Sequence, residues 1–98
     1  MTITKNMNGT TLEVALEGRL DTMTAPELEA ELNQSMDSAE SLVLDFSNLD
    51  YISSAGLRVL LSAQKIMVKQ GTMKITNVAE IIMEIFDVTG FSDILTIE

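Results

Sequence analysis

The sequence predicts an α/β fold, a single domain over residues 1–98 with a mixed, mostly parallel sheet of four to five strands. It adds an N-terminal antiparallel hairpin strand and three or more helices mainly on one face. The 98 residues match the size of one domain, without a linker or repeat. Strand-like and helix-like segments alternate, which favours right-handed crossovers between parallel strands. The second predicted strand is half polar, which indicates that helices cover only one face.

The chain opens with a predicted hairpin. Thr11–Gly18 alternates between apolar and polar residues, the pattern of a half-buried strand, and its apolar set is Leu12, Val14 and Leu16. The dipeptide Asn8-Gly9 just before it is a strong hairpin-turn signal. Residues 2–7 are therefore expected to form the partner strand at the sheet edge, with Ile3 pointing inward.

A first helix and a third strand come next. Thr24 is expected to cap the helix, Glu27 to close a capping box, and Pro26 fits the first turn. The buried stripe of this helix is Leu28, Leu32 and Met36. The near-continuous apolar run Ser41–Phe46 suits either a strand buried on both faces or a parallel strand inside the sheet, with the polar stretch 47–52 after its end.

The rest of the sequence predicts a second helix, a short strand and a third helix. Helical spacing of apolar residues extends from about Ser53 to Lys69, and Gly71 ends that helix. Met73–Thr76 reads as a short strand. Asn77 is expected to cap the last helix and Gly90 to end it. The tail after it is expected to add a last strand or a short helical turn.

Composition excludes several classes of function. Without Cys or His, the chain has no disulfide, thiol nucleophile, imidazole base, Cys/His zinc site or Ser-His-Asp triad. Fifteen acidic residues against six basic ones give a net charge of −9, which disfavours nucleic acid and anionic membranes as partners. No apolar run approaches the length of a membrane span, and the N-terminus lacks a signal-peptide pattern, so a cytoplasmic protein is expected.

Polar residues at the predicted strand ends give little signal for catalysis or metal binding. Ser54 has no His to activate it, and the nearest lysines on its helix lie about three turns away. Three aspartates could gather around Mg²⁺, although loop aspartates more often form turns and caps: Asp21, Asp45 and Asp50. No phosphate-loop or dinucleotide motif is present. We therefore expect no catalytic residue, no metal site and no cofactor.

The segment Ser53-Ser54-Ala55-Gly56, where a loop becomes a helix, is the densest polar cluster at a strand end. One serine is the expected N-cap, and capping alone would account for it. A helix needs only one cap, however, and Gly56 in the first turn would leave the backbone open to close approach by a partner. Arg58 is either a solvated arginine or a further partner contact.

Residues 45–61, D-F-S-N-L-D-Y-I-S-S-A-G-L-R-V-L-L, resemble a STAS domain, specifically the free-standing anti-sigma factor antagonists of bacteria. The resemblance extends to Gly18–Asp21, to Asn77-Val78 and to Phe86–Phe91, and so spans essentially the whole chain. It implies a switch protein in transcription regulation and not an enzyme.

The resemblance also implies partners and a modification. Members of this family bind an anti-sigma factor that is also a serine kinase of the histidine-kinase-like ATPase fold, and binding frees the sigma factor. The kinase phosphorylates a serine at the start of the helix after the third strand, which dissolves the complex, and a metal-dependent serine phosphatase resets the switch. A monomer or weak dimer is expected.

Carried onto this sequence, the phosphorylated serine falls on Ser54. The preceding position, often Asp in the family, is Ser53 here, which makes Ser53 the second candidate. The family's loop aspartate falls on Asp21. The residues expected to bind the partner are Asp21, Ser53, Ala55, Gly56, Leu57 and Arg58.

Two other functions stay open at this point. The domain could be an adaptor of the same fold that is never phosphorylated, in a transport or stress-signalling assembly. It could also bind a nucleotide in the crevice at the strand ends.

Overall fold

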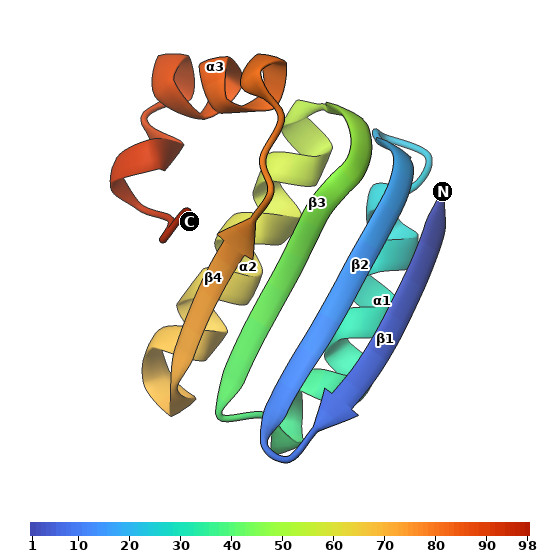
Figure 1. The fold of residues 1–98 in the computed structure, drawn as a ribbon, viewed down its shortest axis with the longest axis vertical. Coiled ribbons are helices and arrows are strands. Elements are labelled where there is room, and N and C mark those ends of the chain that lie inside the picture. Colours follow the sequence, from blue (N-terminus) through green and yellow to red (C-terminus); the bar gives the residue numbers. More distant parts are fainter.

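Four strands form one sheet in the computed structural model, which describes residues 1–98 (Figure 1). The strands are β1 (Thr2–Asn8), β2 (Thr11–Leu20), β3 (Ser41–Ile52) and β4 (Thr72–Thr76). Their order in the sheet follows the sequence. Strand β1 pairs with β2 antiparallel, and β2, β3 and β4 run parallel. The predicted hairpin, with its first strand at the sheet edge, is therefore confirmed.

Two of the three helices connect the parallel strands, and the third follows β4. The helices are α1 (Ala25–Ser35), α2 (Ser54–Gln70) and α3 (Glu80–Thr89), with 3₁₀ turns at Met36–Ser38 and Phe91–Asp93. In Figure 1, α1 and α2 lie behind the sheet and α3 lies beyond the ends of β3 and β4. None of these helices combines the length and the apolar character that a membrane crossing requires.

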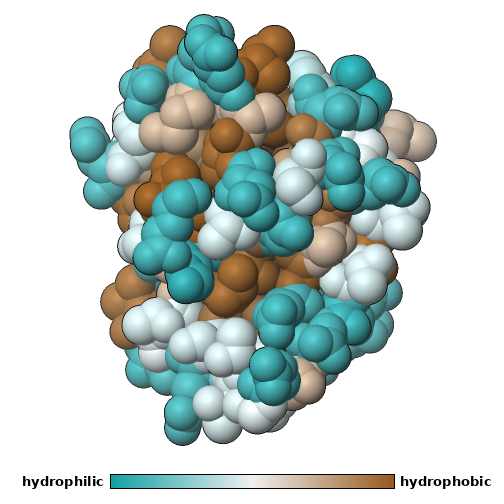
Figure 2. Space-filling view, viewed as in Figure 1, coloured by the Kyte–Doolittle hydropathy of each residue, from teal (hydrophilic) through white to brown (hydrophobic).

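One face of the sheet carries the core. Along β2, Leu12, Val14 and Leu16 are buried, whereas Glu13 and Glu17 on the other face are exposed. The core is one cluster of 24 buried apolar residues, and no polar or charged residue is buried. The opposite face is open, and hydrophilic side chains are interspersed across it (Figure 2). Helices on one face and a half-polar second strand were both predicted.

Strand β3 differs from its prediction. It runs to Ile52, well past Phe46, because residues 47–52 continue to pair with β2 through two register shifts. Its apolar run is not buried on both faces, since Leu44 and Phe46 are buried but Val43 is only half-buried. The second alternative, a parallel strand inside the sheet, is the correct one.

Two predicted helix caps are wrong. The Thr24 hydroxyl does not cap α1, and no capping box with Glu27 forms, because Thr24 Oγ1 donates to Arg19 O at 2.7 Å and accepts from Asp21 N at 2.8 Å. Asn77 does not cap α3, which begins after Ala79; Asn77 instead has a φ of 57°. A polar side chain before a helix does not cap the helix when it forms a hydrogen bond with another group instead.

The helix ends and the tail agree better with the sequence. Gly71 follows α2 directly, and Gly90 ends α3 with a left-handed φ of 82°. The tail supplies both a short helical turn and a single parallel bridge between Ile75 and Ile97. Leu95 is buried, so the tail closes the core next to β4.

Candidate functional site

The carboxyl ends of β2 and β3 lie side by side. Leu20 and Ile52 are the last paired residues of the two strands, and Ser53 N donates to Leu20 O at 2.9 Å. The loop that begins at Asp21 and the start of α2 at Ser54 therefore leave the sheet from adjacent positions. Parallel strands end at the same edge of a sheet, which brings these two segments together.

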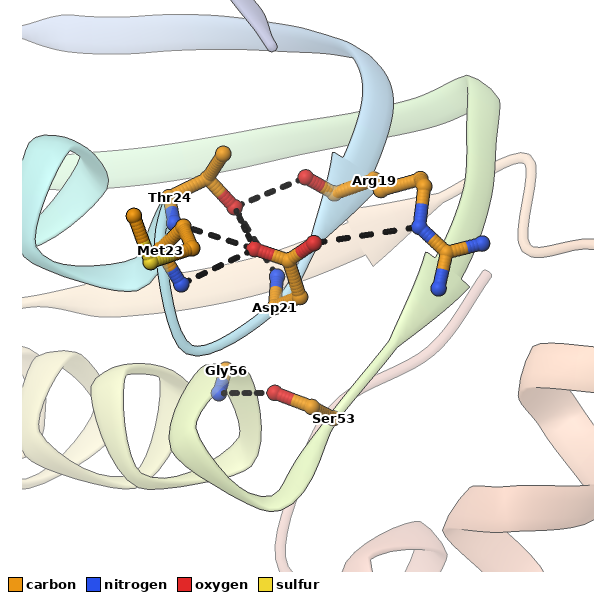
Figure 3. Close-up of polar contacts among 6 residues, drawn as sticks. All are labelled: Arg19, Asp21, Met23, Thr24, Ser53 and Gly56. Atoms are coloured by element: carbon orange, nitrogen blue, oxygen red, sulfur yellow. Dashed lines mark hydrogen bonds and ion pairs between the residues drawn. The ribbon is translucent and has the colours of Figure 1, made fainter.

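Asp21 is held in one orientation by its own loop. Its Oδ1 accepts from Met23 N at 3.0 Å, from Thr24 N at 3.1 Å and from the Thr24 hydroxyl at 3.2 Å (Figure 3). The backbone N–H of Thr24 is the largest cause of a lowered pKa of Asp21, with further contributions from Met23 and Arg19. Asp21 is therefore a fixed negative charge on the loop next to α2.

Arg19 joins this loop to β3. Its Nε lies 3.7 Å from Asp21 Oδ2, and its guanidinium carbon lies 4.3 Å from the centre of the Tyr51 ring. Arg19 and Tyr51 are directly paired across the two strands. Sequence reasoning did not single out this contact, because the pairing depends on the register shift between Gly18 and Arg19.

The two serines have different surroundings. Ser53 is the N-cap of α2: its backbone is extended, and its Oγ accepts from Gly56 N at 3.4 Å (Figure 3). Ser54 is the first residue of the helix, and it is exposed. The prediction that one serine caps the helix is therefore confirmed for Ser53, and the hydroxyl of Ser54 has no hydrogen-bond partner within the chain.

Gly56 has a packing role that the sequence did not predict. It is buried, and a Cβ built on it would lie 2.7 Å from Leu20 Cγ and 2.9 Å from Ile52 Cγ1. The lack of a side chain lets α2 pack closely against the ends of β2 and β3. Close packing therefore explains the glycine, and a partner contact at Gly56 stays a prediction.

The other residues expected to contact the partner differ in their exposure to solvent. Leu57 is buried at 7% exposure, so it belongs to the core and offers little to a partner. Asp21, Ser53 and Ala55 are half-buried, and Ser54 and Arg58 are exposed. The accessible surface at this strand edge therefore consists of the Asp21 loop and the outer side of the first turns of α2. We call it the strand-edge surface, and its members are Asp21, Ser53, Ser54, Ala55 and Arg58.

The remaining aspartates do not build a metal site. Asp45 Oδ1 accepts from Ser47 N and from Asn77 Nδ2, both at 3.0 Å, which ties the middle of β3 to the end of β4. The Asn77 amide is the largest cause of a lowered pKa of Asp45. No group of three acidic side chains is close enough together to hold a metal ion.

Comparison with known proteins identifies relatives across nearly the full chain. The family described as "Mlab, STAS domain" matches residues 3–96. BtrV of Bordetella bronchiseptica, which carries the name of an anti-sigma factor antagonist, is 40% identical over 88 residues, covering 88% of this chain and 76% of that protein. The anti-sigma-B factor antagonist of Bacillus subtilis is 31% identical over 91 residues, covering 92% and 84%.

Among solved structures, the phosphorylated form of the Bacillus cell fate determinant SpoIIAA has the same fold. Its TM-score to this chain is 0.77 at 16% identity, with 99% of this chain and 91% of that chain covered.

Proposed function

The chain belongs to the STAS domain family, and from that premise we propose that it acts as an anti-sigma factor antagonist and has no catalytic activity of its own. In its unphosphorylated form it binds an anti-sigma factor, which then releases its sigma factor. The names of its relatives support this function. The protein works in the cytoplasm as a monomer or weak dimer, without nucleic acid as a partner.

The anti-sigma factor is also a serine kinase of the histidine-kinase-like ATPase fold, and it phosphorylates Ser54. The observation that carries this proposal is the position of Ser54, which is exposed at the first residue of α2, at the strand edge from which the Asp21 loop also leaves the sheet. A kinase can reach this hydroxyl without unfolding the domain. Ser53 is less suitable, because its hydroxyl already caps the helix.

A phosphate at this position is compatible with the folded domain. The first backbone N–H groups of a helix have no acceptor inside it, and the helix dipole favours negative charge at this end. Modification therefore acts on the contact surface and not on the fold. A serine phosphatase removes the phosphate and restores binding.

Phosphorylation weakens the complex by electrostatics. It adds about −1.5 to −2 charges to the strand-edge surface of a chain whose net charge is already −9. In the complex this charge would be desolvated beside the kinase's own catalytic carboxylate and nucleotide phosphates. Repulsion and uncompensated burial together cost about 3 kcal/mol or more, which weakens binding at least about a hundredfold.

The direct test is phosphorylation by the purified cognate anti-sigma factor with radiolabelled ATP. We expect Ser54→Ala to abolish labelling and retain binding, and Ser53→Ala to be labelled. Labelling that is lost in Ser53→Ala and kept in Ser54→Ala would show that the modified residue is Ser53 and not Ser54. Binding without any labelling would favour an adaptor that is never phosphorylated, and binding of a labelled nucleotide by the isolated domain would favour a nucleotide-binding module.

A further inference from the structure

Arg58 is a cation without a partner in the structure. It is exposed on α2, and the three ion pairs of the chain involve other basic residues. Arg19, the other arginine, is already engaged with Asp21 and Tyr51. The Arg58 guanidinium is therefore free to take an anion that reaches the same side of the helix.

Position along the helix places Ser54 within reach of Arg58. Both lie in α2, four residues apart, so their Cβ atoms are about 5–6 Å apart on one side of the helix. An anionic side chain one turn N-terminal to a cationic one is the favourable order, because each charge then also suits the helix dipole. The planar guanidinium can donate two parallel hydrogen bonds to phosphate oxygens.

No carboxylate on the helix competes for this arginine. The chain has 15 acidic residues among 98, yet the 17 residues of α2 include none. Within one turn of Arg58 the residues on the same side are Ser54, Ala55, Leu61 and Ser62. A phosphate on Ser54 would be the first anionic group on this helix.

We propose that phosphorylated Ser54 forms an ion pair with Arg58, so that modification also withdraws Arg58 from the strand-edge surface. This inference rests on the proposed function, in which Ser54 is the modified residue. The switch then has two parts: it adds negative charge at Ser54, and it removes a positive group that would otherwise be offered to the partner. Arg58 is thus a positioning residue for the phosphate.

The pair can be tested without any partner protein. Phosphoserine is incorporated at position 54 by genetic encoding, and the second ionisation of the phosphate is followed by ³¹P NMR as a function of pH. This ionisation has a pKa near 6 in a free phosphoserine. We expect Arg58→Gln to move the titration midpoint up by about 0.5 pH unit, because the dianion loses a cation that stabilises it. Arg58→Lys should fall between the two, since lysine keeps the charge and loses the bidentate geometry.

Lys65→Gln is the matched control. It removes the same charge from the same helix, at a position eleven residues and about 16 Å along the axis from Ser54. At physiological salt its effect on the titration should be less than about 0.1 pH unit, because that distance is about twice the screening length. Equal midpoints in Arg58→Gln and Lys65→Gln would overturn the proposed pair. Both residues are exposed, so the variants should fold, and circular dichroism checks that they do.

The outcome is separable from that of the proposed function. Because the phosphoserine is introduced during synthesis, the titration reports on the pair whether or not a kinase modifies Ser54. A shifted midpoint in Arg58→Gln supports the pair even if the labelling assay assigns another residue, in which case the proposed function fails alone. An unshifted midpoint together with labelling of Ser54 overturns the pair and leaves the proposed function standing.

Discussion

At the scale of single residues, the two adjacent serines predict different effects of removing a hydroxyl. Ser53→Ala deletes the acceptor for Gly56 N and should lower the free energy of unfolding by about 0.5–1 kcal/mol, the low end for a cap because the bond is 3.4 Å long. Ser54→Ala should change it by less than about 0.5 kcal/mol, since that side chain is exposed. Urea unfolding of both variants measures this, and an equal loss in the two would contradict the assignment of Ser53 as the cap.

Gly56 gives a sharper test of packing against propensity. Helix propensity alone predicts that Gly56→Ala stabilises α2 by about 1 kcal/mol. The added Cβ would lie 2.7 Å from Leu20 Cγ in the core, so we expect a net loss of about 1–3 kcal/mol in the free energy of unfolding. The control is Ser62→Ala, an exposed change in the same helix that should stay within about 0.5 kcal/mol of the parent. A Gly56→Ala variant at least as stable as the parent would show that the core yields to the methyl group.

At the scale of elements, Asp45 and Asn77 join the middle of β3 to the end of β4 and predict a dependence on pH. A carboxyl with a lowered folded-state pKa stabilises the fold above its unfolded pKa, and that contribution is lost as the pH falls through the folded value. The stability advantage of the parent over Asp45→Asn should therefore be greatest near neutral pH, begin to fall below about pH 4 and disappear below the folded-state pKa. Its size should not exceed about 1 kcal/mol, because solvent screens this side chain.

Asn77→Gly provides the matched variant for this pair. Glycine accepts the left-handed backbone at this position, so the change removes the amide donor without backbone strain. The acid sensitivity of the unfolding free energy should fall in this variant as it does in Asp45→Asn. A stability difference from the parent that is the same at all pH values would refute the role given to the Asp45 charge.

Gln70 at the end of α2 holds the connection between α1 and β3, so its replacement should lower the stability of the fold. Its Nε2 donates to Met36 O at 2.6 Å and to Ala39 O at 2.8 Å. Gln70→Ala leaves both carbonyls without this donor and should cost about 1–2 kcal/mol in thermal or urea unfolding. Gln34→Ala, an exposed glutamine on α1, should be neutral within about 0.5 kcal/mol, and equal effects in the two variants would argue against the bridge.

Most elements followed from the sequence because their signals are local. The turn at Asn8-Gly9 fixed the hairpin, and alternating β and α segments fixed the parallel crossovers. The length of β3 did not follow, because residues 47–52 join the sheet only through irregular pairing with β2. The caps at Thr24 and Asn77 were mispredicted because each side chain has another partner: Thr24 bonds within its own loop, and Asn77 bonds to Asp45 across the sheet.

The candidate site was predictable only in part. The approach of Asp21 to the start of α2 followed from adjacent parallel strands, and the cap at Ser53 followed from residue type. The contact of Arg19 with Tyr51 depends on a register shift that leaves no pattern in the sequence. The burial of Gly56 was likewise invisible, since a glycine that opens a surface and a glycine that permits close packing look the same in sequence.

At the scale of the whole molecule, the acidic charge of the chain sets the expected response to salt and to a phosphate mimic. Ser54→Asp adds one charge and two acceptor oxygens, fewer than a phosphate, so it should weaken binding to the anti-sigma factor less than phosphorylation does. Raised salt should recover only part of the affinity lost on phosphorylation, because desolvation and steric terms are not screened. Surface plasmon resonance at two salt concentrations measures both effects. Full recovery of the affinity at high salt would show that the switch acts through long-range repulsion alone.

The central claim is that phosphorylation of Ser54 prevents binding while the domain stays folded. The most direct measurement is isothermal titration calorimetry of the cognate anti-sigma factor with the unmodified chain and with the chain carrying phosphoserine at position 54. The fold of both forms is checked by two-dimensional NMR. We predict affinities that differ at least about a hundredfold and backbone shifts confined to the Asp21 loop and the first turns of α2. Affinities within about threefold of each other, or a rearrangement that spreads through the sheet, would contradict the account.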